Sequence, residues 1–142
     1  MERRWAGWVL LGIVAAAFFA GCGDNPLGRK AISGQVTLNG EPLGSGSIEF
    51  TPLAEGGVGS GGLIESGAYS IAADQGLPPG KYRVSIIDNP PAPPLPAGHM
   101  PGDPLPPPPK PLIPANWNSK SEQTIEVKPE GPFTFNFDIK TK

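Results

Sequence analysis

The sequence predicts an all-β fold, an antiparallel β-sandwich of six to seven short strands. In several segments apolar and polar residues alternate with a period of two, which places the apolar side chains of an extended strand on one face. Glycine and proline separate these segments and mark turns between them. No segment has the apolar period of a helix. Short strands of this kind pack as two sheets, each with one face in water.

The first strands follow one another closely. Residues 32–38 alternate up to Asn39-Gly40, a dipeptide that suits the left-handed backbone angles of a tight hairpin turn. A second alternation covers residues 47–51. A weaker strand is expected at 63–65, before a turn at Ser66-Gly67. These segments predict the first three strands of the domain.

The next two strands are expected on either side of a turn. Tyr69 and Ile71 continue the alternation, and residues 82–86 repeat it. Between them, Pro79-Gly80 predicts a type II turn, because proline presets one angle and glycine supplies the positive φ of the next position.

The chain ends with two more expected strands. Ile125 and Val127 form a short apolar set. The last strand has the heaviest apolar face, with Phe133, Phe135 and Phe137 followed by Ile139. We expect the three phenylalanines in the core, because a small domain needs their apolar area to fold.

A proline-rich segment, residues 89–114, interrupts the strands. Half of its residues are proline, including four in a row at 106–109. Proline lacks a backbone donor, so the segment can form neither a helix nor a central strand. Polyproline II or irregular extended chain is expected, serving either as a docking segment or as a spacer.

The N-terminus has the order of a bacterial lipoprotein signal peptide, residues 1–21. Arg3 and Arg4 precede an apolar segment from Trp5 to Ala20, and small residues lead into Cys22, the only cysteine. In that pathway the cysteine sulfur receives a diacylglyceryl group and the cysteine becomes the new N-terminus. The apolar segment is slightly shorter than the roughly 20 residues that a membrane-spanning helix needs. An uncleaved signal anchor is the alternative.

The mature protein is therefore expected to be exported and held at a bacterial membrane surface, periplasmic or outer, by acyl chains on Cys22. Residues 22–30 form a polar tether, and residues 31–142 form one sandwich domain interrupted by 89–114. Removing residues 1–21 takes away one Glu and two Arg, a net +1, so the formal charge changes from −2 to −3. This mild acidity argues against a nucleic-acid partner.

The residues give little support to an enzyme, a metal site or a cofactor. His99, the only histidine, lies in the proline-rich segment, and no pattern of zinc or calcium ligands accompanies it. One ligand-binding alternative remains. Trp117 with Asn116 and Asn118 combines an aromatic ring with amides, the chemistry that sugars favour, although Trp117 also suits a half-buried position at one end of the sandwich.

Several motifs carry a family resemblance. Ser33–Leu43 followed by Gly46–Phe50 resembles the opening of carboxypeptidase regulatory-like domains, and Gly67–Ile71 with Leu77–Val84 resembles their second signature. Ile113–Asn118 before the last strands is similar to short surface lipoproteins of planctomycetes. The resemblance implies a transthyretin-like (prealbumin-like) sandwich and a non-catalytic surface module.

Two functions are consistent with these features. The first is a membrane-anchored envelope lipoprotein that acts as a structural or protein-interaction module. The alternative is a module that binds a carbohydrate or a peptide at the cell surface, with a glycan rather than an envelope protein as its partner.

Overall fold

The computed structural model describes residues 25–141, so the predicted signal peptide and Cys22 lie outside the described residues. The strands are β1 (Ile32–Leu38), β2 (Glu41–Pro42), β3 (Ser45–Pro52), β4 (Ser60–Glu65), β5 (Ala68–Ile71), β6 (Gly80–Asp88), β7 (Thr124–Val127) and β8 (Phe137–Ile139), and one 3-10 turn, η1, covers Ala115–Trp117. The described part is all-β, as predicted, with no α-helix.

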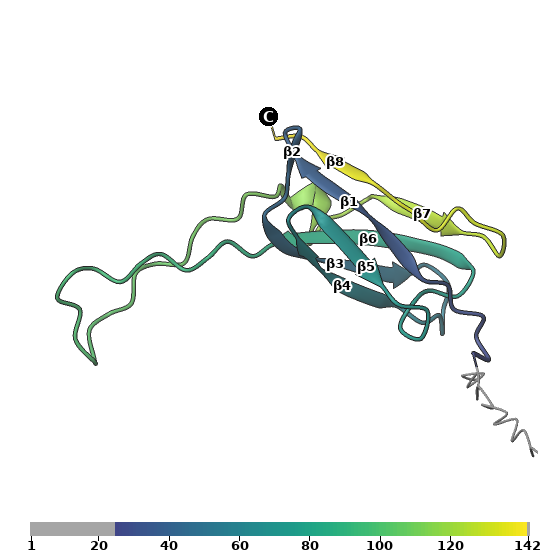
Figure 1. Cartoon of the computed structure of the whole chain (residues 1–142), viewed down its shortest axis with the longest axis horizontal. Coiled ribbons are helices and arrows are strands. Elements are labelled where there is room, and N and C mark those ends of the chain that lie inside the picture. The colour runs from purple at the N-terminus through teal and green to yellow at the C-terminus, as the bar shows by residue number, and fades with distance from the viewer. Residues whose placement is uncertain (1–24, 142) are drawn as a thin grey trace, which may run out of the picture.

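Seven strands form one antiparallel sheet in the order β2-β1-β5-β4-β3-β6-β7, and the sheet curls into a half-barrel (Figure 1). The eighth strand, β8, pairs with β1 in parallel, whereas the sequence predicts only antiparallel pairs. The parallel direction follows from the connection, because the chain crosses from β7 at one end of the strand order to the far edge of β1 before it pairs.

Two predicted turns are confirmed. Asn39 and Gly40 have φ values of 54° and 88°, and they join β1 to β2 as a tight hairpin. Ser66 and Gly67 have φ values of 49° and 77° and join β4 to β5. In both turns, residues that tolerate left-handed angles stand where the strand direction reverses.

The predicted type II turn at Pro79-Gly80 is wrong. Gly80 does not have the positive φ that this turn requires, and it begins β6. The chain turns earlier, where the N–H groups of Gln75 and Gly76 donate to the carbonyl oxygens of Ala72 and Ala73. Such local hydrogen bonds satisfy the backbone before the prolines, which then lead into β6 as extended chain.

The core lies on the concave face of the sheet. The alternation predicted from the sequence puts every second side chain there; in β6, for example, the buried and exposed positions alternate. The buried apolar residues form one cluster: Ile32, Val36, Leu43, Ile48, Phe50, Ile64, Tyr69, Ile71, Leu77, Tyr82, Val84, Ile86, Ile113, Val127 and Ile139.

The phenylalanines of the last strand are less buried than predicted. Phe133, Phe135 and Phe137 are half-buried and pack against the edge of the core, and only Ile139 of this apolar set is fully buried. Only Phe137 lies in β8, so the regular strand is shorter than predicted, and Phe133 and Phe135 flank the isolated bridge between Ser33 and Thr134. Both segments pair with β1 alone, so they have a neighbouring strand on one side only. An edge strand leaves part of each large side chain in water.

The chain enters the sheet just after the predicted tether. Lys30 and Leu77 exchange backbone hydrogen bonds of 2.8 and 3.1 Å, so the last tether residue already belongs to the domain. Before it, the side chain of Asn25 bonds both the N–H and the carbonyl oxygen of Arg29, at 2.8 Å each. Across residues 25–141, no helix has the length and apolar character needed to cross a membrane.

Candidate functional site

The most prominent surface feature is the proline-rich segment. It contains no helix or strand, as predicted, and most of it projects from one end of the sheet as a long loop (Figure 1). We call the projecting part, residues 90–111, the arm. The described chain begins at the opposite end of the molecule, beyond the entry to β1. A tether at residue 25 therefore leaves the arm on the far side of the domain.

The base of the arm is held by one acidic side chain. Asp88, the last residue of β6, is only 8% exposed. Its two carboxyl oxygens accept hydrogen bonds from the N–H groups of Leu112 (2.7 Å) and Ile113 (3.3 Å). On the outgoing side, Asn89 N–H donates to Ser45 O at 3.1 Å, and the Ser45 hydroxyl donates to Asn89 O at 2.6 Å. Both ends of the arm are thus fixed to the sheet.

The tip of the arm is also ordered by local hydrogen bonds. His99 N–H donates to Pro96 O at 3.1 Å, and Asp103 N–H donates to Met100 O at 3.1 Å. The Asp103 carboxyl accepts a further bond from Met100 N–H at 2.9 Å. His99, which the sequence offers as the only candidate for histidine chemistry, lies at this tip and is partly exposed.

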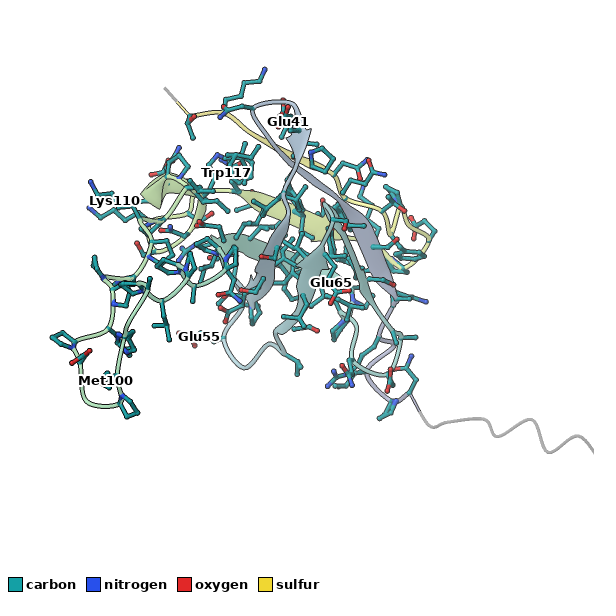
Figure 2. All side chains as sticks on the ribbon, turned by 60° about the vertical axis from the view of Figure 1, so that its left-hand side comes forward. Glu41, Glu55, Glu65, Met100, Lys110 and Trp117 are labelled. Carbon is teal, nitrogen blue, oxygen red and sulfur yellow. The ribbon has the colours of Figure 1, made fainter. Side chains whose placement is uncertain are left out.

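The arm presents apolar side chains to solvent. Met100 is 68% exposed near the end of the arm (Figure 2). Leu105 is 75% exposed, and Leu95 is exposed between two prolines. The arm carries one acid, Asp103, and one lysine, Lys110. Extended proline-rich chain with projecting apolar side chains has the chemistry of a docking element, because its conformation is populated before binding.

The three residues of the ligand-binding alternative lie at η1, on the body of the domain. Trp117 is half-buried and packs its ring edge-on against Phe137, with 6.2 Å between ring centroids. The Asn118 side chain donates to Ile113 O at 3.3 Å and also accepts a bond from Ser119 N–H. Asn116 is exposed. The structure therefore brings the three residues together, but it uses the ring and one amide for packing.

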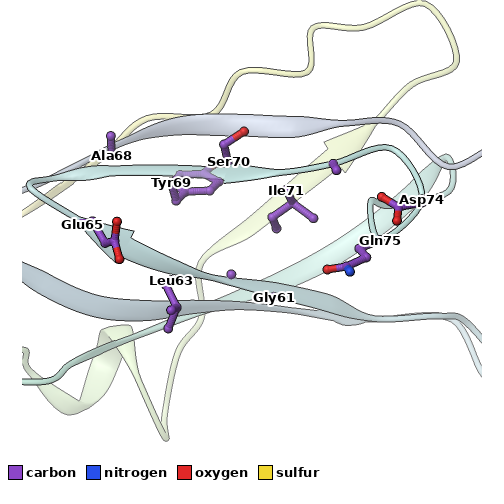
Figure 3. A pocket seen from close by; sticks show the side chains of 11 residues that line it. Gly61, Leu63, Glu65, Ala68, Tyr69, Ser70, Ile71, Asp74 and Gln75 are labelled. Atoms are coloured by element: carbon purple, nitrogen blue, oxygen red, sulfur yellow. The ribbon is translucent and has the colours of Figure 1, made fainter.

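A groove runs along the outer surface between β4 and β5. The two strands share one register pair, Glu65 with Ala68, and then diverge (Figure 3). The groove has a volume of about 730 Å³. At its far end the Ser60 hydroxyl donates to Gln75 O. Sequence reasoning missed this feature.

Two buried tyrosines of the core, Tyr69 in β5 and Tyr82 in β6, have raised pKa values. Burial raises the pKa of Tyr69 well above its usual value of 10.0, and its hydroxyl donates to Phe135 O at 2.7 Å. Burial also raises the pKa of Tyr82, while the nearby Arg29 acts in the opposite direction. Both phenols are neutral structural donors at physiological pH.

Within residues 25–141, no three His, Cys, Asp or Glu side chains lie close enough to hold a metal ion. Of the predicted site residues, Cys22 lies outside the described residues. The residue that sequence reasoning missed is Asp88. Its signal is the alternation of β6, in which Tyr82, Val84 and Ile86 point inward and Asp88 takes the next inward position.

Comparison with known proteins gives no match: no family model, curated protein or solved structure is similar to this chain.

Proposed function

We propose that this chain is an exported bacterial lipoprotein, anchored by acyl chains on Cys22, whose β-domain is a non-catalytic module that presents the arm to another protein of the envelope. The signal-like N-terminus and the single cysteine support the anchoring. Two acyl chains suffice for stable attachment, since each buried methylene contributes about 0.8 kcal/mol.

The observation that carries this proposal is the construction of the arm. Its two ends are fixed by Asp88 and Ser45, and its exposed apolar residues lie away from the sheet. Three exposed apolar side chains, of Leu95, Met100 and Leu105, lie on this one projecting segment, where a partner can contact them. Because proline restricts the free chain, little conformational entropy is lost when such a segment docks.

For the fold, we propose the transthyretin-like sandwich that the sequence motifs suggest. The pairing of the strands supports a sandwich of two layers. Strands β5, β1 and β8 are joined to β4, β3, β6 and β7 through the single Glu65–Ala68 pair, and buried side chains of both groups share one core. Two groups of strands that meet only at one hairpin can face each other as two layers.

Photo-crosslinking in cells tests the interaction. A photoreactive amino acid at Met100 should give a discrete crosslinked product on membranes. The same amino acid at Leu53, which is 48% exposed on the body of the domain, serves as the matched control. Equal amounts of crosslinked product from Met100 and Leu53 would show that the arm is not the docking element.

A further inference from the structure

The groove between β4 and β5 has an apolar and acidic lining. Leu63, in its wall, is 71% exposed, and Ala68 on the opposite wall is exposed, whereas Ile71 is buried and belongs to the core. Glu65 lies at one end and Asp74 at the other, and the lining contains no lysine or arginine (Figure 3). The groove thus offers apolar contact between two negative charges.

The arm has the complementary chemistry. Leu105 is its most exposed apolar residue, and Lys110 is its only cation. Between them lie the four prolines 106–109. In polyproline II form, residues 106–110 span about 15 Å at roughly 3.1 Å per residue. The six residues of β4 span about 20 Å at roughly 3.3 Å each, so the groove is long enough for this stretch.

Prolines cannot donate to a sheet edge, so this stretch would lie on the groove by apolar contact and charge rather than as an added strand. The arm of the same molecule points away from the sheet (Figure 1). The occupant must therefore come from another molecule, and a second copy supplies the required charge and shape.

We infer that the arm of one copy docks in the β4–β5 groove of a second copy, with Lys110 held by Glu65 or Asp74. The inference rests on the proposed function and names the partner as another copy of this chain. The contact is head-to-tail, since arm and groove are different surfaces. Such contacts produce rings when they close and chains when they do not, so the protein would assemble along the membrane surface.

Disulfide trapping of the full chain on membranes tests this contact. Two copies with different epitope tags are co-expressed, one carrying Leu63→Cys and the other Leu105→Cys, and copper phenanthroline is added as oxidant. We expect a disulfide-linked product that contains both tags. The matched control pairs Leu53→Cys with Leu105→Cys. Each cysteine variant is also expressed alone, to show whether Cys22 forms disulfides. We expect none through Cys22, because the proposed acylation blocks its sulfur.

Charge reversal supplies the decisive comparison. Lys110→Glu in the Leu105→Cys copy should lower the yield about threefold, as expected for an exposed ion pair. Adding Glu65→Lys and Asp74→Lys to the Leu63→Cys copy should restore it. All five substituted positions are exposed, and yields are compared at equal membrane levels. The inference is overturned if the disulfide yield equals that of the Leu53 control, or if it is the same in the charge-reversal variants as in the original pair.

The outcomes also separate this inference from the proposed function. If the photoreactive Met100 variant captures a different protein while the cysteine pair gives no product, the second-copy inference is wrong and the interaction function stands. If neither experiment gives a product, both are wrong.

Discussion

Asp88 fixes the root of the arm with a single side chain. Its carboxyl group is buried, and a buried polar group costs free energy unless it is hydrogen-bonded. Here both oxygens accept hydrogen bonds from backbone N–H groups, those of Leu112 and Ile113. The Asp88 side chain thus joins the last residue of β6 to the chain that returns from the arm, which explains an acid at an inward position of β6.

Trp117 is the other residue whose environment decides its role. Its ring contacts Phe137 and the edge of the core, and the neighbouring Asn118 bonds to the backbone of Ile113. A sugar-binding platform needs an open ring face with free amides beside it. The packing of Trp117 therefore favours the interaction module over the glycan-binding alternative.

Tyr69→Phe should change how stability depends on pH. The raised pKa keeps the folded phenol protonated, whereas the unfolded phenol ionises near 10. The stabilisation is complete below pH 10 and is lost as the pH rises above it, by up to about 1.4 kcal/mol per pH unit. At pH 7 the variant should lose about 1 kcal/mol with the bond to Phe135 O, and above pH 10 its stability should fall less steeply. Urea unfolding at pH 7 to 11 measures both effects.

Tyr82→Phe is the matched control for this experiment. Its pKa is also raised by burial, but Arg29 opposes the shift, so a smaller change in slope is expected. Parallel stability profiles for the wild type and Tyr69→Phe above pH 10 would contradict the prediction.

At the scale of elements, the strands were predictable because their alternation is local. The turns at Asn39-Gly40 and Ser66-Gly67 were predictable for the same reason, since their residues tolerate left-handed angles. The partial exposure of Phe137 was not predictable, because it depends on which strand lies at the sheet edge. The β4–β5 groove could not be predicted from the sequence either, since the divergence of two strands is a property of the tertiary structure.

The candidate site was likewise only partly predictable from the sequence. The arm was predictable, because proline excludes regular structure without any tertiary information. The C-terminal boundary of the irregular segment was not predictable. Ile113 lies inside the proline-rich segment 89–114, yet it is 3% exposed and belongs to the core. The end of the segment is thus part of the folded domain.

Replacing residues 90–111 with a short Gly/Ser linker should leave the domain folded, with a change in unfolding free energy within about 1–2 kcal/mol. The Asp88 bonds to Leu112 and Ile113 remain in this variant. Replacing 90–114 instead removes Ile113 from the core and should cost about 2–5 kcal/mol. Urea unfolding followed by circular dichroism compares the two. Equal stability of both variants would show that Ile113 contributes nothing.

At the scale of the whole molecule, the proposed function depends on the separation of two ends of the domain. The described chain begins at one end of the half-barrel, and the arm extends from the other (Figure 1). An anchor preceding residue 25 would place the sheet near the membrane and direct the arm outward. Head-to-tail docking between anchored copies would require the domains to tilt, so that the arm of one copy lies alongside the sheet of the next.

The last prediction concerns the anchor itself. Mass spectrometry of the membrane-bound protein should find a chain that begins at Cys22 and carries a diacylglyceryl group, because small residues precede the only cysteine. Cys22→Ala should lack this modification and lose its stable place in the membrane fraction, since the acyl chains supply the apolar area that holds it there. The sheet should be unchanged, because the first backbone bonds of the domain begin at Lys30. Gly23→Ala, which keeps the sulfur, is the control and should remain acylated. A mature chain that begins at Met1 would show instead that residues 1–21 stay attached as a signal anchor.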